Sequence, residues 1–142
     1  MNYRIIKKLL CLILVSTISI GTAAAVEVQP RWSYILTISG DIDISSAGVA
    51  TVRGNGSARL NDVDKLVITL ELQQFINGKW QTKNTWTETA QFYTITTDNH
   101  YWGVAHGYSY QLYITLKAYK GNQLLETGTG TLSYGPASSN YV

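Results

Sequence analysis

Two histidines and an aspartate stand close together in the stretch DNHYWGVAHG, residues 98–107. His100 and His106 are the only histidines of the chain, and with Asp98 they offer the ligands of a zinc site or the parts of a general base. No motif fixes their geometry, so polar loop residues are the commoner explanation. We therefore expect no catalytic site, no metal and no cofactor. A small hydrolase that uses these three residues is kept as an alternative.

Two pairs of aspartates have the spacing of neighbours on one face of an extended segment, Asp41 with Asp43 and Asp62 with Asp64. Carboxylates so placed sometimes bind calcium, but no full ligand loop surrounds either pair. Solvated positions in turns or edge strands are the expected explanation. No serine stands in a Gly-x-Ser-x-Gly setting, so nucleophilic catalysis has no support from the sequence.

Aromatic residues are more informative than the histidines. Four tryptophans and nine tyrosines follow residue 25, more than a core of this size readily buries. If these aromatics hold a ligand, we expect it at the loop 99–106, because recognition by sandwiches concentrates in end loops, and on tyrosines of an exposed face. Cross-strand aromatic pairs that stabilise a sheet without a ligand are the alternative. The expected ligand contacts are Trp102, Tyr101, His100, His106, Tyr113 and Tyr119.

The elements that position these residues have the pattern of an all-β protein. The stretch GYSYQLYITLKA, residues 107–118, alternates large apolar with mostly polar residues, as in a strand with one buried face. Frequent Gly and Asn between short Thr-, Tyr- and Val-rich runs predict a single antiparallel β-sandwich of about seven strands. The strands are expected at 32–39 (extended by 41–45 after a kink at Gly40), 48–53 (before a break at GNGS), 65–75, 80–88, 90–97, 107–118 and 123–133.

The turn INGK decides where Trp86 lies. Asn77 and Gly78 both tolerate positive φ, so a hairpin is expected here. A two-residue turn sets Trp86 on the wet face, whereas a three-residue turn with a glycine bulge, which pairs Phe75 with Lys79, sets it in the core. We favour the bulged turn because burying a tryptophan stabilises the fold by a few kcal/mol.

The first 25 residues have the three parts of a secretory signal peptide: a basic start, an apolar run from Leu9 to Ile20, and small residues up to Ala25. The run is shorter than the roughly 20 residues that cross a bilayer, so we expect cleavage after Ala25 and no stable membrane insertion afterwards. The expected organisation is a signal peptide (1–25), a β-sandwich domain (26–135) and a flexible C-terminal tail (136–142). The protein is expected to be secreted.

Removing the signal peptide changes the charge. Arg4, Lys7 and Lys8 are removed with it, so eight basic and nine acidic residues remain and the net charge falls from +2 to about −1. Nucleic acid is not an expected partner, since binding it needs clustered Lys and Arg. Cys11, the single cysteine, also leaves, so the mature domain is cysteine-free and depends on packing.

Gly107 and Tyr110 open an alternating strand, which the turn KGN connects to a threonine-rich last strand. This pattern resembles the last hairpin of fibronectin type III and other immunoglobulin-like sandwiches. The resemblance implies that Tyr110, or Tyr108 in its place, bonds back to the backbone at the corner before its strand. His106 stands where those folds have a proline.

The segments PRWSYI, LQQFINGKW, GYSY and LLETGTG also look like the short exported proteins of Gram-positive bacteria that are grouped as a domain of unknown function. That resemblance implies export and an all-β fold, and no activity. The expected function is a non-catalytic binding or adhesion module for an extracellular glycan, wall polymer or protein. A self-assembling structural protein is the alternative, and the sequence does not fix the oligomeric state.

Overall fold

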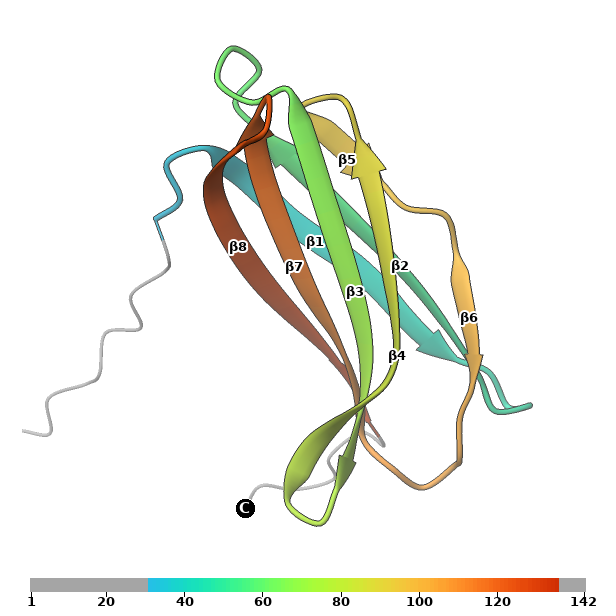
Figure 1. The fold of residues 1–142 in the computed structure, drawn as a ribbon. Helices are drawn as coiled ribbons and strands as arrows, with labels where there is room; N and C mark the ends of the chain where they lie inside the picture. Colours follow the sequence, from blue (N-terminus) through green and yellow to red (C-terminus); the bar gives the residue numbers. More distant parts are fainter. Residues whose placement is uncertain (1–30, 136–142) are drawn as a thin grey trace, which may run out of the picture. The chain divides into compact units, whose positions relative to one another are not determined.

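The computed structural model describes residues 31–135, which form two antiparallel sheets packed face to face (Figure 1). The first sheet has the order β1-β2-β5, with β6 also paired to β2, and the second has the order β4-β3-β7-β8. The predicted all-β antiparallel sandwich is confirmed, with eight strands in place of about seven. They are β1 (Ile35–Ile44), β2 (Val49–Ala58), β3 (Lys65–Ile76), β4 (Lys79–Ala90), β5 (Thr94–Thr96), β6 (His100–Gly103), β7 (Tyr110–Lys120) and β8 (Gln123–Tyr134).

The predicted signal peptide, residues 1–25, and the predicted tail, residues 136–142, lie outside the described residues. Within residues 31–135 no helix is long and apolar enough to cross a membrane.

The core lies between the sheets and is built mainly by the two central strands of the second sheet. Alternate residues of β3 and β7 point inward, as the two-residue period of a strand requires. Each of these fully buried side chains stabilises the fold by about 1.5–3 kcal/mol on the usual area scale. They are Leu66, Ile68, Leu70 and Leu72 of β3 and Leu112, Ile114 and Leu116 of β7, all 0–1% exposed.

Strand β2 continues through GNGS, so the predicted break there is wrong. Gly54 and Gly56 face the second sheet, and a Cβ atom on either would lie 2.5–2.6 Å from a leucine methyl of the core. These glycines therefore make room for core side chains and do not turn the chain. Gly40 likewise lies within β1, which runs through it as one strand.

The hairpin between β3 and β4 has a two-residue turn, so the favoured three-residue turn is wrong. Asn77 has a φ of 53° and Gly78 a φ of 75°, and Ile76 pairs directly with Lys79. Positive φ at both central residues is the turn that matches the twist of the flanking strands.

Trp86 nevertheless lies on the core face of β4. The ladder is interrupted at Lys83, an extra residue between Thr82 and Asn84. This bulge moves the rest of the strand by one position, so Trp86 pairs with Leu70 and packs, half-buried, against the core. Trp86 therefore has the predicted core-facing orientation, but through a bulge in the strand and not one in the turn. Its partner is Leu70, whereas the bulged turn would pair it with Ile68.

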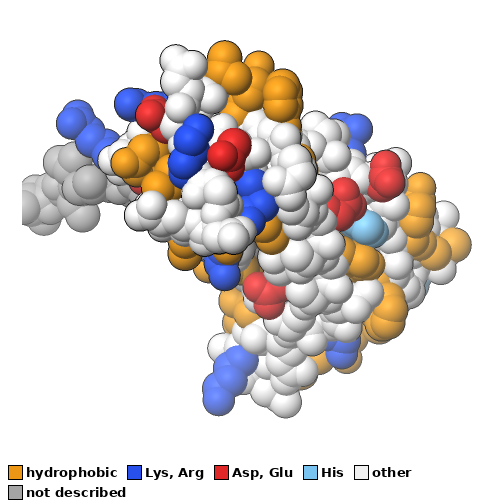
Figure 2. Space-filling view, turned by 45° about the horizontal axis from the view of Figure 1, so that its top comes forward, with side chains coloured by type: hydrophobic (Ala, Val, Ile, Leu, Met, Phe, Trp, Pro, Cys, Tyr) orange, Lys and Arg blue, Asp and Glu red, His pale blue; other side chains and the backbone are white. Residues whose placement is uncertain are grey.

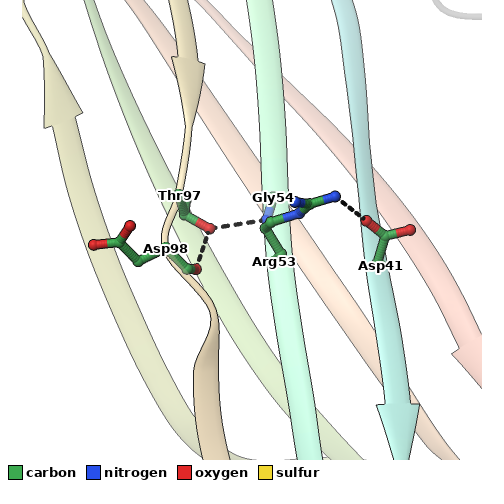
Figure 3. A network of polar contacts seen from close by, with 5 residues as sticks. All are labelled: Asp41, Arg53, Gly54, Thr97 and Asp98. Atoms are coloured by element: carbon green, nitrogen blue, oxygen red, sulfur yellow. Dashed lines mark hydrogen bonds and ion pairs between the residues drawn. The ribbon is translucent and has the colours of Figure 1, made fainter.

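The stretch between β5 and β7 is not only a loop, because residues 100–103 pair with β2 as β6. Thr97, which is 3% exposed, keeps the chain on β2 between β5 and β6. Its N–H donates to the Gly54 carbonyl oxygen (2.9 Å). Its Oγ1 accepts from the Gly54 N–H (3.0 Å) and donates to the Asp98 carbonyl oxygen (2.9 Å), as Figure 3 shows. The same view shows the exposed ion pair of Arg53 with Asp41 across β1 and β2.

Glu126 of β8 connects the two sheets at the flank where β1 packs on β8. Its carboxylate accepts hydrogen bonds of 2.7–2.8 Å from the three successive N–H groups of residues 33–35. Burial raises the pKa of the Glu126 carboxyl, but these N–H groups and Arg59 lower it by more, so that pKa lies below its ordinary value of 4.5.

Candidate functional site

Three connections far apart in the sequence meet at one end of the sandwich (Figure 1). The Val104 N–H donates to the Gly48 carbonyl oxygen (2.8 Å), which joins the β6–β7 loop to the β1–β2 turn. The Phe75 N–H donates to the Ser109 carbonyl oxygen (2.9 Å), which joins the β3–β4 hairpin to the same loop.

Large apolar side chains gather at this end of the sandwich. Phe75 and Trp80 face each other across the hairpin with ring centroids 5.1 Å apart. We call this region the aromatic end and define it by five side chains, each 38–44% exposed: Val49, Phe75, Trp80, Trp102 and Tyr108. Tyr108 lies on a loop and the other four side chains lie near the ends of strands. Exposed apolar side chains that a rigid sheet positions in this way are a common arrangement for binding.

An open hollow of about 400 Å³ lies within the aromatic end. It is bounded by the end of β1 and the turn after it, by the β6–β7 loop and the start of β7, and by the end of β8. We call it the end hollow. Its lining residues are Ile44, Ser45, Ser46, Ala105, His106, Gly107, Tyr108, Tyr110 and Tyr134.

Tyrosine hydroxyls fix two walls of the end hollow. The Tyr110 hydroxyl donates to the Ala105 carbonyl oxygen (2.5 Å), and the Tyr134 hydroxyl donates to the Ile44 carbonyl oxygen (3.1 Å). Burial raises the pKa of Tyr110, which outweighs the lowering by the bond to Ala105, and the neighbouring Tyr108 raises it further. The Tyr110 hydroxyl therefore keeps its proton and remains a donor at any physiological pH.

The turn that forms the third wall depends on Gly48, whose φ is 75°. A Cβ atom there would lie 2.8 Å from the Val104 carbonyl oxygen and 3.3 Å from Nε2 of His106. Only glycine combines this backbone conformation with so close an approach. His106 is thereby seated over the turn at the edge of the hollow.

The structure brings only part of the predicted contact set to this place. His106 lines the end hollow, and Trp102 belongs to the aromatic end. Tyr101 is 61% exposed but pairs with Thr51, so it lies on the outer face of the first sheet, opposite to the face of its neighbour Trp102. Tyr101 and Trp102 therefore cannot stack on one small ligand.

His100 is engaged within the fold. Its ring stacks on Trp86 with centroids 5.2 Å apart and an interplanar angle of 17°, and its Nε2 lies 2.7 Å from a carboxylate oxygen of Glu88. These contacts join β6 of the first sheet to β4 of the second, so His100 and Trp86 close the second flank of the sandwich.

Tyr113 and Tyr119 lie on the outer face of the second sheet and are half-buried. Tyr119 is nine residues along β7 from Tyr110, about 30 Å from the end hollow at the usual rise per residue. The Lys65 ammonium lies 4.5 Å from the centroid of its ring. Tyr119 therefore lies too far from the end hollow to contact the same small ligand.

The candidate residues of a hydrolase are not assembled into a metal site. Among residues 31–135, no group of three or more His, Cys, Asp or Glu side chains is placed to hold a metal ion. In the aspartate pairs, Asp41 pairs with Arg53, and Asp64 accepts from the Gly121 N–H at 2.8 Å.

Ser46 and Tyr134 are not among the contacts that the sequence predicts, and Tyr108 is predicted only as a corner residue. Tyr134 pairs directly with Tyr110. Counting back from the KGN turn with regular pairing places Ser133 opposite Tyr110, one residue away from the observed partner. The difference is a bulge near Tyr119, for which the sequence has no signal.

No protein-family model and no curated protein matches this chain. A solved structure, described as the crystal structure of a protein from Archaeoglobus fulgidus, is similar with 12% sequence identity and a TM-score of 0.34. The similarity covers 70% of this chain and 94% of that one.

Proposed function

We propose that this chain is a secreted, non-catalytic binding module of the immunoglobulin-like type, whose aromatic end holds an extracellular glycan, wall polymer or protein. The observation that carries the proposal is an open hollow lined by Tyr108, Tyr110 and Tyr134 at the end of the sandwich where Phe75, Trp80 and Trp102 are also exposed. Concave sites with aromatic walls and a few polar groups are the usual form of a ligand site.

The immunoglobulin-like part of the proposal is supported by two features. The strand orders β1-β2-β5 and β4-β3-β7-β8 divide the chain between two sheets, with sequence neighbours β2 and β3 in different sheets. The bond from Tyr110 to Ala105 at the start of β7 has the form of the tyrosine corner of such domains. The secreted part is supported by the pattern of the first 25 residues.

Retention on surfaces tests the binding function. The purified mature chain, residues 26–142, is incubated with intact bacterial cells, wall fractions and immobilised host-surface material, and the retained fraction is measured. We expect saturable retention that an excess of soluble wall fragments abolishes. A folded chain that is retained by none of these materials would remove the proposal.

One observation favours self-assembly as a second candidate function. β8 is an edge of the second sheet, and its residues 127–134 carry no charged side chain and no proline. The other edge, β4, carries Lys79, Lys83 and a bulge, which discourage pairing with a further strand. Association through β8 predicts multimers in light scattering that rise with concentration and that Thr129→Lys abolishes; a strict monomer at all concentrations excludes it.

A further inference from the structure

The lining of the end hollow holds no permanently charged side chain. Its nine described lining residues include no Asp, Glu, Lys or Arg. Elsewhere, charged side chains of both signs are interspersed over the surface, as the face in Figure 2 shows. A ligand that carries phosphate, sulfate or carboxylate groups would lose water on entering the hollow and gain no ionic partner, so the lining favours a neutral ligand.

The lining combines aromatic surface with polar atoms that are not engaged elsewhere. Tyr108 is 44% exposed and presents its ring at the rim. None of the side-chain hydrogen bonds found among residues 31–135 involves Ser46, His106 or Tyr108. An aromatic ring beside free hydroxyl and imidazole groups suits a sugar, which has an apolar C–H face and a polar edge of hydroxyl groups.

The size and stiffness of the hollow fit a short saccharide. Its volume of about 400 Å³ lies in the lower part of the usual range for small-ligand sites. The walls are fixed before any ligand arrives by the bonds of Tyr110 and Tyr134, so little ordering cost remains for binding.

We propose that the end hollow binds the ring of an uncharged sugar, which stacks on Tyr108 and bonds to Ser46 and His106. This inference rests on the proposed binding function and deepens it. Of the ligand classes considered, it selects neutral glycans over anionic wall polymers and over proteins.

Binding is tested by NMR titration of the isotope-labelled mature chain with neutral di- and trisaccharides of glucose, galactose, mannose and N-acetylglucosamine. Sialylated and sulfated saccharides of matched length and a proline-rich peptide form the other arms. We expect saturable shifts at residues 45–46 and 106–108 with at least one neutral saccharide. Tyr108→Ala should weaken that binding about tenfold or more, and Tyr108→Phe should retain most of it, because the ring is kept. Phe92→Ala, at the other end of the sandwich, is the control and should change nothing.

The inference is overturned if no neutral saccharide binds, if only the anionic saccharides or the peptide bind, or if the shifts map to another surface. It is also overturned if Tyr108→Ala binds as tightly as the parent chain. Retention on cells without saccharide binding leaves the binding function in place and removes only the sugar assignment. Saccharide binding without retention on any surface would keep the sugar assignment and remove the proposed binding to cells, wall fractions and host-surface material.

Discussion

Glu126 and His100 each join the two sheets by one polar side chain, at opposite flanks. The Glu126 carboxylate accepts hydrogen bonds from three backbone N–H groups, those of residues 33–35, where the chain enters β1. The His100 ring stacks on Trp86, and its Nε2 lies within hydrogen-bond distance of the Glu88 carboxylate. Neither role has a signal in the sequence, because each depends on a pairing between residues far apart in the chain: 91 positions separate Glu126 from Ile35.

The charge of Glu126 should make stability depend on pH. Its pKa is lowered in the folded state, so its contribution is fully present above the ordinary carboxyl value of 4.5 and is lost as the pH falls through the folded-state pKa. We expect Glu126→Gln to lower the free energy of unfolding by about 1–3 kcal/mol at neutral pH, because the amide satisfies fewer of the three N–H groups. The difference from the parent chain should shrink below about pH 4.5.

Urea unfolding of both chains between neutral pH and about pH 3 measures this difference. Asp62→Asn removes one charge from an exposed loop position and is the matched control; it should be close to neutral. A difference between Glu126→Gln and the parent that does not change with pH would contradict the role of the carboxylate.

At the scale of elements, alternation predicted the strands well where both periodicity and burial were strong. β3 and β7 lie close to their expected positions because every second residue is a large apolar one. β6 was missed because four residues ending in glycine are too few to show a period. The predicted break at GNGS is wrong because residue type alone does not distinguish a glycine that makes room for a neighbouring side chain from one that turns the chain.

The role of Gly40 in β1 can be measured directly. A Cβ atom there would lie 2.6 Å from the Arg53 carbonyl oxygen and 2.8 Å from Cδ1 of Ile114, and the backbone atom cannot move without disturbing β2. We expect Gly40→Ala to destabilise the fold by about 1–3 kcal/mol. Gly103→Ala in β6 is the control, since nothing lies within 4 Å of its Cβ position. Equal midpoints of thermal unfolding for the two variants would show that the close approach at Gly40 does not matter.

The bulge at Lys83 makes a prediction about the deletion of this residue. Deleting this residue leaves a regular ladder in which Trp86 still pairs with Leu70, so the deletion should cost no more than about 1 kcal/mol. Deleting Thr69 from the middle of β3 should abolish folding, because either Leu66 and Ile68 or Leu70 and Leu72 would move to the wet face. Circular dichroism and chemical unfolding of the two deletion variants compare them. An unfolded Lys83 deletion variant would show that the bulge is needed for more than register.

At the scale of the whole sandwich, its two ends differ. The aromatic end combines five exposed large side chains with the larger hollow. The other end has a hollow of about 190 Å³ lined by Leu60, Phe92 and four neighbours, and Leu60 and Phe92 are 60% and 55% exposed. Exposed apolar surface alone therefore does not select the binding end. The selection rests on the meeting of three connections and on the polar groups inside the end hollow.

The sequence indicated part of this site. It predicted that aromatic residues near 99–106 bind, and Trp102 and His106 do lie at the aromatic end. The sequence did not predict that Phe75, Trp80 and Tyr134 lie at this end. They come from a hairpin and a last strand whose place at this end follows from the strand order. Composition shows that aromatics are in excess, but only the fold shows which of them meet.

The most direct test of the account compares the two ends in one retention measurement on bacterial cells and wall fractions. The double variant Trp102→Ala/Tyr108→Ala removes side chains of the aromatic end, and Leu60→Ala/Phe92→Ala removes two side chains from the other end that are more exposed. We predict that the first double variant loses at least about nine-tenths of the specific retention, as expected for the loss of anchor residues, and that the second retains it. Loss of retention only in the second variant, or in neither, would contradict the assignment of binding to the aromatic end.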